Sequence, residues 1–180
     1  AVQNGSIGLV SLNWKLKQEG VYGQVEMAFM DNQDQPIPLM RGDVAAICCF
    51  EPYAALAEQN GWGKRLWVPY DSPMGKTNLG FVASAAFVKK DPELTKKMVA
   101  AHVKATKEMA SNPAIAIETT IKQFKMTKEV AELSTKNLFF TSESGPTFVG
   151  GLKALAKMMM DDKMLEKEPN WDEFLNLGYV

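Results

Sequence analysis

Residues 41–53 constrain the fold of this chain more than any other stretch. Gly42 and Asp43 mark a turn, and the apolar run behind them is short and β-branched at Val44 and Ile47. A run of this length is too brief for a lone buried helix or for a membrane span. It is therefore predicted to be a buried central strand.

The predicted strand ends on Phe50, Glu51 and Pro52. A proline fits the first turn of a following helix, because its missing N–H is not needed there. Ligands of open α/β sheets bind beyond the carboxyl ends of the strands, so Phe50 and Glu51 are candidate binding residues. The alternative is that Glu51 only caps or solvates the start of the helix.

Helices and strands alternate in the predicted order before residue 71. Helical spacing follows Ser6, partial alternation covers residues 25–30, a short helix ends at Gly42, and a helix over 52–60 precedes a strand over 65–70. This order is typical of a parallel sheet with helical crossovers. Residues 71–78 are rich in turn formers and are predicted to be a lobe boundary or hinge before an extended run over 79–84. From Asp91 onward the spacing predicts four helices and a short terminal one.

The start of the first helix is a second candidate binding element. A helix that opens on Gly5 and Ser6 directs free backbone N–H groups outward, which suits a small anion or the acidic group of a ligand. Every capped helix has this feature, so a purely structural role remains an alternative.

The composition disfavours several classes of function. Charges nearly balance at a net of -1, and no basic run is interleaved with aromatics, so a nucleic-acid partner has no electrostatic support. No nucleophile elbow, paired metal-ligand motif or dinucleotide fingerprint occurs, and His102 is the only histidine. Cys48 and Cys49 are adjacent and are expected to be free buried thiols. We therefore expect a binding module without catalytic residues, metal or cofactor, and not an enzyme.

Several segments together resemble the solute-binding proteins of nitrate, sulfonate and taurine ABC importers, the NMT1/THI5-like family. The resemblance covers nearly all of the chain, and its order and spacing are more specific than any one motif. It implies an α/β type II periplasmic-binding-protein fold, in which two lobes are joined by crossing hinge strands and hold the ligand in a cleft. The segments that carry it are Asn4-Gly5-Ser6, Phe29-Met30, residues 41–53, residues 81–94 and residues 168–174.

The resemblance also implies a division of the chain and a set of site residues. Residues 1–76 would form the second α/β lobe without its first strand, and residues 77–180 the hinge strand and helical C-terminal part of an incomplete first lobe. The chain would then be a C-terminal portion of a longer protein. The implied ligand-binding residues lie at the cleft or the hinge: Asn4, Gly5, Ser6, Phe50, Glu51, Thr77 and Asn78.

The implied function is the extracytoplasmic solute-binding component of an ABC importer. Such a protein binds a small organic or inorganic anion or zwitterion, of the sulfonate, taurine or nitrate class, and delivers it to a membrane permease. The resemblance implies a periplasmic or lipid-anchored location and a monomer when complete. A helix start favours an anion, whereas Glu51 favours a cation, so an amino sulfonate would satisfy both.

Two alternatives share the same fold. The first is the pyrimidine synthase of thiamine biosynthesis, which uses a cysteine-rich iron-binding run just before the return strand. Residues 74–80 contain no cysteine, and Cys48-Cys49-Phe50 imitates part of that run on a different predicted strand. The second is a cytosolic ligand-sensing domain.

Overall fold

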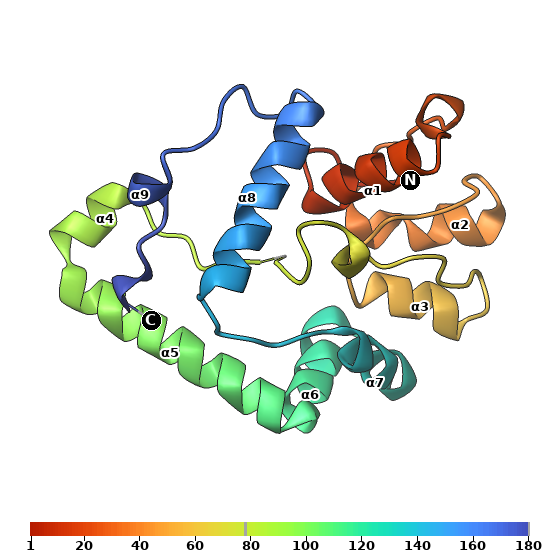
Figure 1. Ribbon diagram of the computed structural model, residues 1–180. Helices are drawn as coiled ribbons and strands as arrows, with labels where there is room; N and C mark the ends of the chain where they lie inside the picture. Colours follow the sequence, from red (N-terminus) through yellow and green to blue (C-terminus); the bar gives the residue numbers. More distant parts are fainter. Residues whose placement is uncertain (78, 180) are drawn as a thin grey trace.

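The structure is a computed structural model that describes residues 1–77 and 79–179. Regular structure in these residues is almost entirely helical (Figure 1). Short 3-10 turns connect some of the helices: η1 (Tyr22–Gln24), η2 (Asn32–Asp34), η3 (Pro69–Asp71) and η4 (Leu177–Tyr179). The helices are α1 (Ile7–Gln18), α2 (Pro36–Arg41), α3 (Tyr53–Gln59), α4 (Ala85–Lys90), α5 (Pro92–Ser111), α6 (Pro113–Phe124), α7 (Lys128–Asn137), α8 (Pro146–Asp161) and α9 (Trp171–Phe174).

The predicted α/β fold is wrong, because the described residues form no β-strand and no sheet. A type II periplasmic-binding-protein fold with two lobes and crossing hinge strands is therefore not present in residues 1–77 and 79–179. In the part of the chain that the structure describes, two isolated parallel bridges occur, from Val2 to Phe29 and from Val2 to Cys48. Parallel sheets need cover on both faces, and here Ala45, Ala46 and Phe29 are exposed. The apolar pattern of residues 44–50 was therefore not sufficient to form a strand.

Val2 nevertheless lies between two other segments that run in the same direction. Its N–H donates to the carbonyl oxygen of Ala28 at 3.0 Å, and its own carbonyl accepts from the N–H of Met30 at 3.2 Å. On the other side, the N–H of Cys48 donates to the carbonyl of Ala1 at 2.8 Å. Because both bridges are parallel, the chain leaves all three segments at the same end.

The helix starts follow the signals in the sequence. Ser6 caps α1 by accepting a hydrogen bond from the N–H of Leu9, and Asp91, Asn112 and Thr127 cap α5, α6 and α7 in similar ways. These starts confirm the predicted helix boundaries at those positions. Helix α4 was not predicted, because the extended run was expected over residues 79–84 and no element was assigned to residues 85–90.

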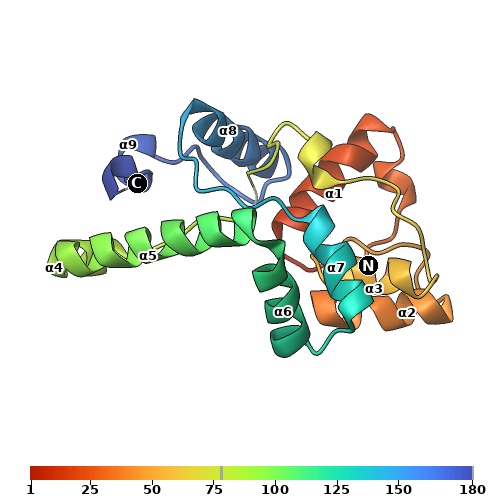
Figure 2. The same ribbon diagram turned by 90° about the horizontal axis from the view of Figure 1, so that it is seen from below.

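The small apolar core lies between α1 and α8. In Figure 1, α8 lies between helices α1, α2 and α3 on one side and helices α4 and α9 on the other. Helix α8 packs on α1, and Met158 of α8 clusters with Val10 of α1 and with Met74. Helix α7 packs on both α3 and α6, and the rings of Tyr53 and Phe124 meet edge to face at 6.3 Å. Helix α5 extends away from α1–α3 (Figure 2). No helix among the described residues combines the length and apolar character that crossing a membrane requires.

Candidate functional site

The first candidate element is the turn that precedes α1. Asn4 and Gly5 form this turn and are exposed, and Gly5 has a φ of +66°. An L side chain rarely adopts that backbone conformation, so glycine is needed to reverse the chain there. Only Gln3 separates the turn from Val2, so the turn lies at the shared end of the three parallel segments.

Ser6 links this turn to the helix. Its hydroxyl donates to the carbonyl of Gln3 at 2.7 Å and accepts from the N–H of Leu9 at 3.1 Å. Among the described residues, the N–H groups of Ile7 and Gly8 have no hydrogen-bond acceptor. Unpaired N–H groups at a helix start carry the positive end of the helix dipole, so this end of α1 can attract an anion.

Asn32 joins the turn to Phe50. Its side-chain oxygen accepts from the N–H of Phe50 at 3.2 Å, and its amide nitrogen donates to the side-chain oxygen of Gln3. Sequence reasoning missed Asn32. Asn32 follows Phe29 by only three residues. It is therefore indicated by the rule that ligands bind beyond the ends of parallel segments.

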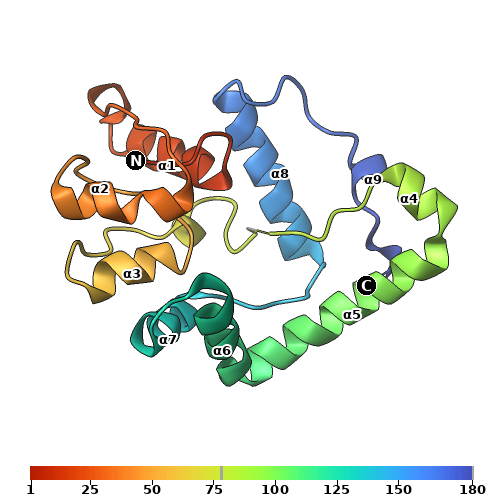
Figure 3. The same cartoon turned by 180° about the vertical axis from the view of Figure 1, so that it is seen from behind.

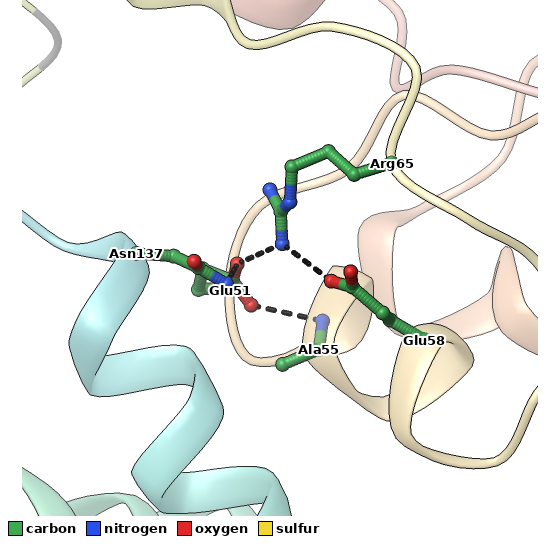
Figure 4. Close-up of polar contacts among 5 residues, drawn as sticks. All are labelled: Glu51, Ala55, Glu58, Arg65 and Asn137. Atoms are coloured by element: carbon green, nitrogen blue, oxygen red, sulfur yellow. Dashed lines mark hydrogen bonds and ion pairs between the residues drawn. The ribbon is translucent and has the colours of Figure 1, made fainter.

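Glu51 lies at the centre of a polar cluster (Figure 4). One carboxylate oxygen, Oε1, accepts from Arg65 Nη2 at 2.9 Å and from Asn137 Nδ2 at 2.8 Å. The other, Oε2, accepts from the N–H of Ala55 at 3.0 Å. Arg65 also bonds Glu58 at 3.2 Å.

These contacts give Glu51 a role at the helix start. Its side chain is only 8% exposed, and Ala55 lies in the first turn of α3. Burial alone lowers the pKa of Arg65, but hydrogen bonds and charge from Glu51 and Glu58 outweigh it and leave that pKa raised. A cationic ligand group at Glu51 would compete with Arg65. Asn137 comes from the end of α7 and no sequence signal indicated it.

Thr77 lies apart from these residues. It is buried beneath α8, where Gly151 allows close approach of the turn over residues 74–77. Among the described residues, no hydrogen bond joins Thr77 to Ser6, Phe50 or Glu51. The remaining predicted site residue, Asn78, lies outside the described residues.

Two surface hollows occur away from the predicted site. One, of about 1130 Å³, lies beside residues 164–173 and Lys153. The other, of about 480 Å³, lies along α5 next to Tyr179. None of the predicted site residues that the structure describes lines either hollow.

The two cysteines are held as neutral thiols. Burial raises the pKa of Cys48 to about 11 and that of Cys49 to about 12. At neutral pH neither is a thiolate, which is the form that attacks substrates and binds metals. In the part of the chain that the structure describes, no group of three His, Cys, Asp or Glu side chains is placed to hold a metal ion.

The chain described so far is largely helical and has free backbone donors at the start of α1. Comparison with known families then identifies it: residues 3–121 match the NMT1-like family, and the chain belongs to that family. Membership indicates a solute-binding or related function with a small-molecule ligand. The match includes Gly5, Ser6, Asn32, Glu51 and Arg65. Neither the curated proteins nor the solved structures gave a match.

Proposed function

We propose that the chain is the solute-binding component of an ABC importer and binds a small anion or zwitterion at the start of α1. The supporting observation is that Asn32 bonds both the side chain of Gln3, which precedes the turn before α1, and the backbone N–H of Phe50. The ligand is of the sulfonate, taurine or nitrate class. The partner is a membrane permease, and the location is periplasmic or lipid-anchored.

The electrostatics of the site support an anionic group. A helix start carries about half a positive charge, and its N–H groups donate directly to an anion. Glu51 directly follows Phe50 in the sequence, but its charge is compensated by Arg65 at 2.9 Å. The half-buried Phe50 offers an apolar surface to the remainder of an organic ligand.

The test is a calorimetric titration with taurine, ethanesulfonate and nitrate. Ser6→Asp keeps a side chain that caps helices well but adds a negative charge at the start of α1. We expect it to weaken binding of the anions by more than about tenfold, since a repulsion of 1.4 kcal/mol suffices for that factor. Thr127→Asp makes a similar exchange at the start of α7, away from the site, and should leave binding unchanged.

A further variant separates an anion site from a zwitterion site. If Glu51 contacts the ammonium group of the ligand, Glu51→Gln weakens taurine but not ethanesulfonate. Unchanged binding of taurine to Glu51→Gln would count against that contact. Equal affinity of Ser6→Asp and the unaltered chain for all three probes would refute the site at α1.

A further inference from the structure

The residues that connect Phe50 to α3 contact the proposed ligand site at one end and helix α7 at the other. At the first end, the N–H of Phe50 donates to the side-chain oxygen of Asn32 at 3.2 Å. At the other end, the carboxylate of Glu51 accepts from the side chain of Asn137, at the end of α7, at 2.8 Å. Because Phe50 and Glu51 are covalent neighbours, a shift of one displaces the other.

Helices α6 and α7 approach α3 as a pair. Figure 3 shows the two helices side by side below α3, and α7 packs on both α6 and α3. The buried side chains of α7 are at most 1% exposed: Val130, Ala131 and Ser134. The rings of Tyr53 and Phe124 add a second contact, between the first residue of α3 and the last residue of α6. The start of α3 is therefore held by elements that lie far along the chain.

The hydrogen bond from Asn137 is not needed to compensate the charge of Glu51. Arg65 already places a positive charge at 2.9 Å, and the N–H of Ala55 bonds the second carboxylate oxygen (Figure 4). Asn137 is neutral, so its contribution is to fix the position of Glu51 relative to α7. Removing its side chain leaves the carboxylate paired, and the chain should still fold.

A buried hydroxyl group makes the packing of α7 less favourable. Thr135 Oγ1 is buried and has no hydrogen-bond partner among the described residues. Thr135 lies one turn after the fully buried Ala131 on α7. A buried donor without a partner lowers stability, because it has lost its hydrogen bonds to water. A single change in α7 can therefore either weaken its packing, at Asn137, or strengthen it, at Thr135.

We propose that Asn137 is a positioning residue for the ligand site: by holding Glu51, it keeps Phe50 in place against the apolar part of an organic ligand. This inference rests on the proposed ligand site at the start of α1. An organic sulfonate has a carbon chain that contacts Phe50, whereas nitrate has none and binds only at the helix start. The contact with α7 therefore selects organic anions over inorganic ones. Because such coupling is reciprocal, a bound sulfonate also stabilises the packing of α7.

The first test is a calorimetric titration of Asn137→Ala with ethanesulfonate and with nitrate. Ethanesulfonate should bind up to about tenfold more weakly, since the loss of one hydrogen bond to a charged group corresponds to about that factor. Nitrate should bind as it does to the unaltered chain. Lys136→Ala is the matched control, because Lys136 is exposed and lies beside Asn137 in the last turn of α7.

Hydrogen exchange tests the same coupling without a ligand. The amides of α7 and the amide of Phe50 should exchange faster in Asn137→Ala than in the unaltered chain. They should exchange more slowly in Thr135→Val, which removes the buried hydroxyl. Phe124→Leu weakens the contact with Tyr53 and should act in the same direction as Asn137→Ala, so the test does not depend on one variant.

Two results would overturn the proposal. In the first, Asn137→Ala speeds exchange in α7 but leaves the Phe50 amide and ethanesulfonate binding as they are in Lys136→Ala, so that α7 packs independently of the site. In the second, ethanesulfonate and nitrate lose affinity equally, which indicates a general effect on the fold. If neither anion binds the unaltered chain, the proposed function fails and the selection of organic anions fails with it. A faster Phe50 amide in Asn137→Ala would then still support the link between α7 and this segment.

Discussion

Gly151 allows α8 to lie directly against the turn that contains Thr77. A Cβ atom at this position would lie 2.1 Å from Thr77 Oγ1 and 2.6 Å from the carbonyl oxygen of Met74. Rotation of Thr77 relieves the first overlap. It does not relieve the second, because the Met74 carbonyl is backbone and accepts the hydrogen bond from the N–H of Thr77 that closes the turn.

Gly151→Ala is therefore expected to destabilise the protein although alanine favours helices. Overpacking costs about 1–3 kcal/mol, and exchange of glycine for alanine inside a helix returns about 1 kcal/mol. Gly150 provides a matched control in the same helix, because a Cβ there meets no atom within 4 Å. The helix-forming gain is common to both variants, so the difference between them is the cost of the contact, about 1–3 kcal/mol.

Urea unfolding followed by circular dichroism measures both free energies of unfolding. Each kcal/mol corresponds to a change in Tm of about 2–4 °C for a chain of this size. Thr77→Ala combined with Gly151→Ala should restore only part of the loss, because the Met74 carbonyl remains in place. The reasoning is refuted if Gly151→Ala is as stable as Gly150→Ala.

Two further predictions concern Arg65 and the thiols. Arg65→Ala should lower the free energy of unfolding by about 1–3 kcal/mol, because it leaves the Glu51 carboxylate buried without its cation. Glu58→Gln should cost less than about 1 kcal/mol, so equal losses in urea would contradict this role for Arg65. The folded thiols of Cys48 and Cys49, with pKa values of about 11 and 12 against an ordinary 9.0, should alkylate more slowly at pH 8 than in urea. Stability should fall as pH rises above 9.0, where the unfolded thiols lose protons first, and replacing both cysteines by serine should flatten this fall.

The sequence predicted the helix starts well because capping is local. A polar side chain at Ser6, Asp91 or Thr127 reaches a backbone N–H three residues further along the chain. A strand, by contrast, depends on partners far away in the sequence. The apolar run over residues 44–50 has the composition of a strand. Its backbone, however, pairs with another segment at only one bridge, at Cys48.

The residues of the candidate site depend partly on local sequence signals and partly on contacts between segments that are far apart in the chain. Gly5, Ser6 and Phe50 were predicted from local signals and from the rule for the ends of parallel segments. Asn32 follows from the same rule once the segment at Phe29 is placed beside Val2. Asn137 is 86 residues from Glu51 in the chain, and its contact depends on how α7 packs on α3.

The proposed ligand site does not depend on the sheet that failed to form. Two parallel bridges are enough to give three segments the same direction, and helices α1 and α2 return the chain to the start of the next segment. The loops that leave the three segments must then meet at one end, where Asn32 joins the turn before α1 to Phe50. Asn32→Ala should therefore weaken the binding of a ligand held at Ser6. A cleft between two lobes would instead require contacts that the described residues do not form.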